Sequence, residues 1–226
     1  MKKFPVTIVD DFYENPDLIR NFALSLPYFK TTDGRWPGSR TELLHNINSN
    51  FFETFNRKLF SLFYDLKTTQ LEWEVETTFQ LIDSFSSDKD NIKNDGWIHW
   101  DKECCFSGVI YLNPNPKPNW GTSVYKLKPN EVYDDTHRTK FLHYSKSDKF
   151  NEQEYEIEKK CNNNKFIETV RVENVYNRLI LFESGVFHGV PSFYSDDESR
   201  LTQVFFVKYL SSSDLYPILR SRVSYD

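Results

Sequence analysis

The 226-residue chain is poor in cysteine and in long apolar runs, and each scarcity excludes a class of protein. Its three cysteines, the adjacent Cys104 and Cys105 and the remote Cys161, match neither a disulfide framework nor a zinc motif. No run approaches the roughly 18 apolar residues of a membrane span, and the N-terminus lacks the apolar segment of a secretion signal. We therefore expect a soluble, intracellular protein of the cytoplasm with reduced thiols.

The chain also has no excess of positively charged residues. The net charge of −5 argues against a broad nucleic-acid-binding surface. Aromatic residues are abundant instead, with 20 Phe and 13 Tyr, which predicts a core of packed rings. The length fits one domain that buries a sizeable core. The composition leaves the oligomeric state open.

Only five histidines occur, and two of them lie in a pattern typical of metal sites. His99 and Asp101 form a His-x-Asp pair; on a strand over residues 96–100 both would point to one face, about 7 Å apart. Trp100 would then face the other way, into the core. His188 follows much later, in a second apolar segment. Two imidazoles and one carboxylate can cap one face of a ferrous ion and leave three positions free.

An arginine follows the third ligand at the start of an alternating strand over residues 201–209. Arg200 is suited to hold a carboxylate through two parallel hydrogen bonds. Thr202 lies on the same strand face and would add a hydrogen bond to the same carboxylate. His137 and His143, the other candidate pair, lack a partner pattern and do not predict a second metal site.

Together these residues resemble the Fe(II)/2-oxoglutarate-dependent oxygenases, most closely the prolyl-4-hydroxylase-like branch. Tyr111-Leu112-Asn113 is similar to that branch's Tyr-Leu-Asn motif. Residues 120–122 stand where the family has Gly-Gly-Glu-Thr, but they keep only one Gly and the Thr. Residues 9–16 and 36–40 resemble an uncharacterised subgroup frequent in phage genomes. The resemblance covers residues 97–209, with a fainter match at the N-terminus.

The resemblance implies a mainly β (α+β) fold, with a double-stranded β-helix, or cupin-like jelly-roll, core and supporting N-terminal helices. It implies Fe(II), 2-oxoglutarate and O2 as cofactor and cosubstrates, with iron on His99, Asp101 and His188. Arg200 and Tyr111 would bind the distal carboxylate of 2-oxoglutarate. The reaction would hydroxylate an unactivated C–H bond and release succinate and CO2. Related halogenases replace the carboxylate ligand, so Asp101 points to hydroxylation, demethylation or desaturation.

The substrate is less well specified by the sequence. A small molecule, an amino acid or a peptide side chain fits best. Arg40, next to a tight turn, and Trp120 are candidate substrate contacts, and Val109 and Val190 are candidate pocket walls. The alternatives are a nucleobase or nucleic-acid oxygenase, which needs a basic groove, and a noncatalytic jelly-roll binding module.

Periodicity predicts the remaining elements of one domain spanning residues 1–226. An N-terminal strand and two amphipathic helices, beginning at Asn15-Pro16 and Asn48, occupy residues 1–70. The jelly-roll core follows over residues 71–210, starting with a long edge strand at 71–83, and residues 211–226 form a tail. Residues 126–165 are a polar insertion with one helix near 151–160. We expect this insertion to be a solvated excursion, with a substrate lid as the alternative for residues 136–143.

Overall fold

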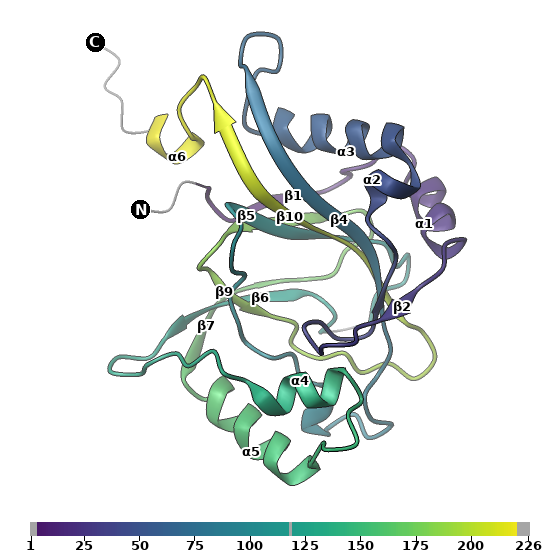
Figure 1. Cartoon of the computed structure of the whole chain (residues 1–226), viewed down its shortest axis with the longest axis vertical. Helices are drawn as coiled ribbons and strands as arrows, with labels where there is room; N and C mark the ends of the chain where they lie inside the picture. The colour runs from purple at the N-terminus through teal and green to yellow at the C-terminus, as the bar shows by residue number, and fades with distance from the viewer. Residues whose placement is uncertain (1–3, 118, 221–226) are drawn as a thin grey trace.

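The computed structural model describes residues 4–117 and 119–220, which form two antiparallel sheets packed between two groups of helices (Figure 1). Within these residues the larger sheet has seven strands in the order β1-β8-β5-β10-β4-β3-β2, and the smaller has the order β7-β6-β9. The strands are β1 (Thr7–Val9), β2 (Phe29–Lys30), β3 (Ser39–Arg40), β4 (Leu71–Ile82), β5 (Phe106–Tyr111), β6 (Thr122–Leu127), β7 (Phe166–Val172), β8 (Leu179–Glu183), β9 (Phe187–Gly189) and β10 (Arg200–Ser212). The helices are α1 (Pro16–Leu24), α2 (Leu44–Ile47), α3 (Ser49–Ser61), α4 (Arg138–Tyr144), α5 (Glu152–Asn163) and α6 (Pro217–Arg220), with a 3-10 turn at Ile92–Asn94.

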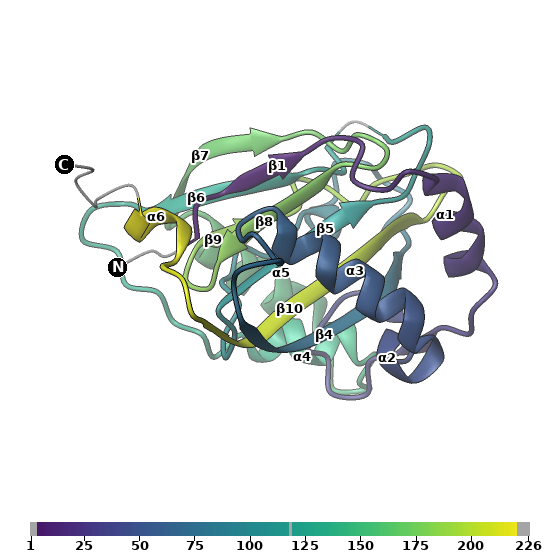
Figure 2. The same cartoon turned by 90° about the horizontal axis from the view of Figure 1, so that it is seen from above.

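The two predicted N-terminal helices form and cover the outer face of the larger sheet (Figure 2). The side chain of Asn48 caps α3 by accepting a hydrogen bond from the Phe51 amide at 3.0 Å. The apolar stripe continues to Leu66, but α3 ends at Ser61. Beyond the helix, the side chain and carbonyl of Asp65 accept hydrogen bonds from the following backbone amides and form a separate turn.

The main hydrophobic core lies between these helices and the larger sheet. Phe55 of α3 and Phe205 of β10 are almost fully buried, with ring centroids 5.5 Å apart. Phe4 packs on Phe106 of β5 at 4.4 Å, which ties the N-terminal segment to the same core. The predicted aromatic core is confirmed by these contacts.

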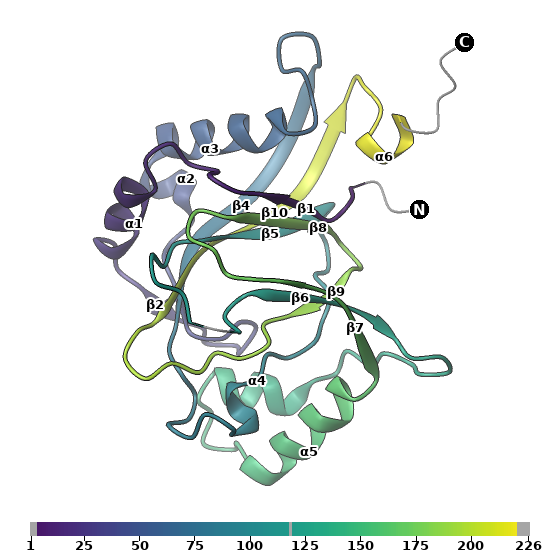
Figure 3. The same ribbon diagram turned by 180° about the vertical axis from the view of Figure 1, so that it is seen from behind.

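The opposite face of the larger sheet looks toward the smaller sheet (Figure 3). Because side chains alternate along a strand, Arg200, Thr202 and Phe206 share this inner face of β10. In the antiparallel register, Thr202 pairs with Tyr111 and Phe206 pairs with Ser107 of β5. The inner face therefore presents polar groups to the space between the sheets.

The position of β4 differs from the prediction of an edge strand. Near its end β4 pairs with β3, through Ser39 with Leu81 and Arg40 with Gln80, and β2 follows outside β3. Two-residue strands carry no periodic signal in the sequence. The pairing brings Arg40 to the sheet that carries Arg200.

The predicted insertion folds into two helices, α4 and α5, where one was expected. The expectation of a solvated excursion is wrong, because Tyr155 and Lys159 on α5 have no exposed surface. Both helices pack at the end of the molecule opposite α3 (Figure 1). Of the predicted tail, residues 221–226 lie outside the described residues, while β10 and α6 include residues before them. In the described part of the chain, no helix has the length and apolar character needed to cross a membrane.

Replacing Phe205 by Ala should lower the free energy of unfolding by about 3–5 kcal/mol, because it empties the contact between α3 and β10. Tyr209→Ala, on the same strand at 49% exposure, is the matched control and should cost well under half as much. Urea unfolding followed by circular dichroism measures both. Equal losses would contradict the placement of the core.

Candidate metal centre

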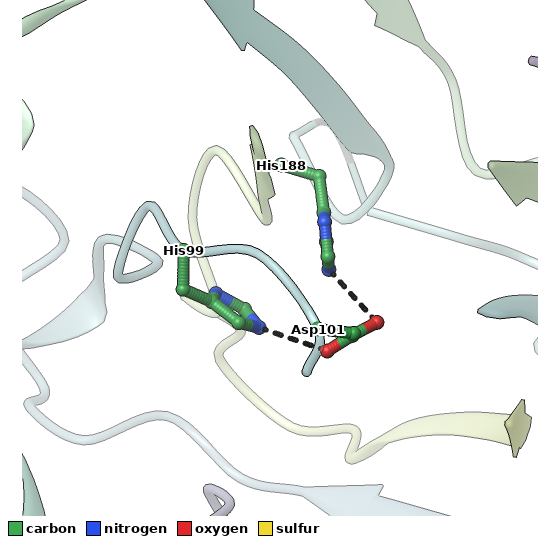
Figure 4. Close-up of side chains that lie close together, drawn as sticks. All are labelled: His99, Asp101 and His188. Carbon is green, nitrogen blue, oxygen red and sulfur yellow. Dashed lines mark ion pairs between the residues drawn. The ribbon is translucent and has the colours of Figure 1, made fainter. Parts of the chain in front are cut away.

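Three side chains with metal-ligating atoms converge at one end of the space between the sheets. His99, Asp101 and His188 each offer a ligand atom, and these atoms lie within 4.8 Å of one another (Figure 4). The two oxygens of Asp101 lie 3.8 Å from His99 Nε2 and 3.6 Å from His188 Nε2. The His99 side chain keeps 35% of its surface exposed, so the cluster is open to solvent on that side. Within the described residues it is the one such group.

The backbone around the first two ligands differs from the predicted strand. Residues 96–101 are extended but pair only at His99, whose N–H donates to the His188 carbonyl at 3.0 Å while His188 returns a bond of 2.8 Å. Trp100 faces away from the ligands, as expected from alternation. It is 38% exposed, however, so its predicted place in the core is wrong.

Side chains of α5 satisfy the backbone groups that a strand partner would otherwise bind. Asn163 accepts from the Ile98 amide at 3.1 Å and donates to the Gly96 carbonyl at 3.0 Å. Asn162 donates to the Ile98 carbonyl at 2.9 Å. The insertion therefore positions the segment that carries His99 and Asp101. Sequence reasoning missed these asparagines, because Asn residues at the end of a polar helix give no signal of a partner elsewhere in the chain.

Backbone carbonyls fix the tautomers of both histidines. His99 Nδ1 lies 2.7 Å from the Trp97 carbonyl, and His188 Nδ1 lies 2.9 Å from the Val186 carbonyl. A carbonyl only accepts, so each Nδ1 carries the hydrogen and each Nε2 presents its lone pair to the cluster. This is the arrangement of imidazoles that bind metals.

Burial and neighbouring charges set the ionisation of the cluster. The buried part of the His99 ring and the nearby His188 lower the pKa of His99 below its ordinary value, which favours the neutral imidazole at pH 7. Burial raises the pKa of Asp101, but His188, His99 and a hydrogen bond from Ser107 outweigh that effect and hold it below the ordinary value. Ser107 was missed, although alternation with Tyr111 puts it on the same face. Neutral imidazole with ionised carboxylate is a donor set that suits ferrous iron.

A buried cation lies farther along the inner face. Arg200 is 3% exposed, donates from Nε to the Trp120 carbonyl at 2.8 Å, and has no carboxylate within 4.0 Å among the described residues. Its guanidinium lies 5.5 Å from the Tyr111 ring, and the Tyr111 hydroxyl donates to Thr122 at 2.8 Å. The buried Thr202 hydroxyl has no hydrogen-bond partner in the described part of the chain. A buried guanidinium with no carboxylate partner among the described residues and an unsatisfied hydroxyl on the same strand face fit an incoming carboxylate.

The remaining candidates occupy different environments. Trp120 is fully buried and its indole N–H donates to the Tyr194 carbonyl at 2.9 Å, so the prediction that it contacts the substrate is wrong. Val109 packs in the small core between the sheets. Val190 is half-buried and its carbonyl accepts from the Gly96 amide at 2.8 Å. Their role as pocket walls stays a prediction.

The two histidines that were not expected to bind metal lie in aromatic surroundings. The His137 ring centroid is 4.9 Å from that of Trp97, and the His143 centroid is 4.5 Å from that of Tyr155. Residues 136–143 thus contribute to the packing of α4 against the ligand segment.

The fold and the cluster define a jelly-roll protein with a two-histidine, one-carboxylate site. The chain belongs to DUF6445, a family of unknown function, whose model matches residues 1–203. No curated protein matches the sequence.

Several solved structures are similar to this chain at low sequence identity. A prolyl hydroxylase from Trichoplax adhaerens, in complex with a hypoxia inducible factor peptide fragment, is 13% identical with a TM-score of 0.51, covering 97% of this chain and 87% of that one. A Pseudomonas putida prolyl-4-hydroxylase is 15% identical with a TM-score of 0.43, covering 89% and 91%. HygX from Streptomyces hygroscopicus, with nickel and 2-oxoglutarate bound, is 13% identical with a TM-score of 0.46, covering 89% and 82%. The Trichoplax likeness confirms the predicted jelly-roll fold.

Removing the hydroxyl that orients the carboxylate should weaken metal binding. Ser107→Ala is expected to raise the Co(II) dissociation constant roughly 10- to 100-fold, the usual effect of losing a group that orients a ligand. Ser211→Ala, at the far end of β10, is the control and should bind Co(II) like the parent. Absorbance titration measures the constants. An unchanged constant in Ser107→Ala would mean that Asp101 needs no such support.

The contacts from α5 predict a second effect. Asn163→Ala should weaken Co(II) binding and speed hydrogen exchange at the Ile98 amide, because that amide loses its acceptor. Asn164→Ala, one residue farther on an exposed surface, should change neither. Exchange followed by NMR, together with the titration, tests this. Ile98 exchange at the parent rate would contradict the positioning role of α5.

Proposed function

We propose that this protein is an Fe(II)- and 2-oxoglutarate-dependent dioxygenase that hydroxylates an unactivated C–H bond of a small molecule, amino acid or peptide side chain. The observation that carries the proposal is the convergence of His99, Asp101 and His188, with both Nε2 lone pairs directed at the carboxylate. The fold shared with a prolyl hydroxylase supports it.

Each group of residues has a distinct part in this reaction. His99, Asp101 and His188 would hold the ferrous ion. Bound iron with 2-oxoglutarate and O2 supplies the oxidising chemistry, with succinate and CO2 as coproducts. The chain itself binds, orients and shields. Arg200, Tyr111 and Thr202 would hold the distal carboxylate of 2-oxoglutarate.

The wider assignment rests on the same site. We propose that residues 1–226 act as a single oxygenase domain, which the shared core around Phe4, α3 and β10 supports. The phage-type subgroup and the cytoplasmic location stay predictions from the sequence. The net charge of −5 favours a small-molecule or peptide substrate over a nucleic acid.

Anaerobic addition of Fe(II) and 2-oxoglutarate should produce the weak visible charge-transfer band of the chelated cosubstrate. His99→Ala should lack the band, whereas His45→Ala, an exposed histidine on α2, should keep it. Oxygen should then release succinate from the parent. A folded parent protein with neither band nor succinate would leave the noncatalytic binding module as the correct interpretation.

The guanidinium that lacks a carboxylate partner provides a separate test. Arg200→Ala should raise the 2-oxoglutarate dissociation constant roughly 10- to 100-fold, because about 1.5–3 kcal/mol of charged hydrogen bonding is lost. Arg171→Ala, on the exposed face of β7, is the control. Titration of the band with 2-oxoglutarate measures both. If Arg200→Ala binds like the parent, another group holds the distal carboxylate.

A further inference from the structure

Two buried cations other than Arg200, Arg40 and Lys140, interact electrostatically with Asp101 of the metal cluster. We propose that Arg40 and Lys140 bind an oxyanion of the substrate, a carboxylate or a phosphate, next to His99, Asp101 and His188. This inference rests on the proposed function and specifies its substrate class. Arg40 was expected to contact substrate. The part played by Lys140, and its combination with Arg40 in one site, follow only from the structure.

Arg40 faces the cluster from β3. Its guanidinium carbon lies 4.7 Å from the Trp36 ring centroid and 5.6 Å from that of Phe206. Phe206 is in register with Ser107, whose hydroxyl donates to Asp101. The aromatic rings thus hold the guanidinium on the same inner sheet face as the hydroxyl that orients the metal ligand.

The Arg40 guanidinium lacks the partners expected of a buried cation. Its Nε is buried without a hydrogen-bond acceptor, and no carboxylate of the described residues lies within 4.0 Å. Burial lowers its pKa to about 10, and attraction to Asp101 and then Glu76 opposes that shift. Glu76 itself lies 3.5 Å from Lys208. At pH 7 Arg40 is therefore a charged donor available to a ligand.

Lys140, on α4, is close enough to the cluster for its charge to act on both His99 and Asp101. It is 8% exposed, and no carboxylate of the described residues lies within 4.0 Å of its ammonium. Burial lowers its pKa to about 8, opposed by attraction to Asp101 and then Glu158, so it stays mainly charged at pH 7. Glu158 instead accepts a hydrogen bond from the Thr139 amide at 3.0 Å.

The two cations come from segments in direct contact. A Cβ on Gly34 would lie 1.9 Å from the Phe141 carbonyl, so only glycine allows the loop before β3 to approach α4 this closely. The positive φ of 76° at Gly34 adds to that requirement. Arg40 and Lys140, which both interact with Asp101, are therefore carried by two segments that pack directly against each other.

Charge balance indicates the kind of ligand. The charges of Asp101, a ferrous ion, dianionic 2-oxoglutarate and Arg200 sum to zero, so the two remaining cations are left uncompensated. Burying unpaired charges is unfavourable, and an anionic ligand would relieve the cost. An arginine fork with a lysine point charge matches the oxygens of a carboxylate or phosphate.

NMR on the full 15N-labelled chain tests the proposal with inorganic phosphate and acetate as probes, at constant ionic strength. The Arg40 Nε–H and Trp36 indole N–H signals, assigned from Arg40→Lys and Trp36→Phe spectra, should shift saturably with at least one anion. A saturable shift with phosphate alone indicates a phosphorylated substrate, and one with acetate alone indicates a substrate carboxylate. Saturable shifts with both anions indicate a general oxyanion site. No saturable shift with either anion would overturn the proposal.

Matched variants separate a specific site from general attraction. Lys140→Met should raise the anion dissociation constant at least tenfold, as followed by the Arg40 Nε–H signal. Arg40→Met should raise it by at least as much, as followed by the Trp36 indole signal. Arg138 on α4 and Arg35 in the loop before β3 are both exposed. Arg138→Met and Arg35→Met should therefore leave the anion dissociation constant unchanged. Equal weakening by the exposed variants would overturn the proposal. Arg40→Lys keeps the charge without the fork and should bind at intermediate strength, which provides a test if Arg40→Met fails to fold.

The closing measurement distinguishes this inference from the proposed function. Co(II) and 2-oxoglutarate are titrated into the parent in parallel with the anions. A parent that binds phosphate or acetate at Arg40 but not 2-oxoglutarate would end the oxygenase assignment and leave the anion site standing. A parent that binds 2-oxoglutarate but neither phosphate nor acetate at Arg40 would support the oxygenase assignment and contradict the anionic substrate.

Discussion

The reciprocal backbone hydrogen bonds between His99 and His188 are the constraint on which the candidate site depends. They join an isolated extended segment to β9 at one residue pair, and both residues are themselves ligands. A shift of one residue would turn one imidazole to the opposite side. The carbonyls of Trp97 and Val186 then fix the tautomers, so backbone groups help direct both Nε2 atoms toward Asp101.

Patterns within single elements were predictable from the sequence. The 3.6-residue period of apolar residues predicted where α1 and α3 begin, and side-chain alternation predicted that Arg200 and Thr202 share one strand face. The His-x-Asp pair could be recognised as a candidate pair of metal ligands from its spacing, although its segment does not form a regular strand. These features depend on residues close together in the chain.

Features that depend on distant contacts were not predictable. The end of α3, the pairing of β3 with β4, and the packing of α5 are decided by partners elsewhere in the fold. Trp100 and Trp120 show the difficulty: both flank the site in sequence, yet one is exposed on the surface and the other has no exposed area. Residue type alone could not separate these outcomes.

The bonds from Asn162 and Asn163 to the ligand segment also bear on the order of folding. The Ile98–Asn163 contact closes a loop of 65 residues, and the His99–His188 bridge closes a longer one. Loop closure of this length costs entropy before its contacts form, so the ligand cluster is complete only when both sheets and the inserted helices are in place. A divalent ion would therefore bind only the finished fold, and its concentration would set how firmly the whole chain resists unfolding.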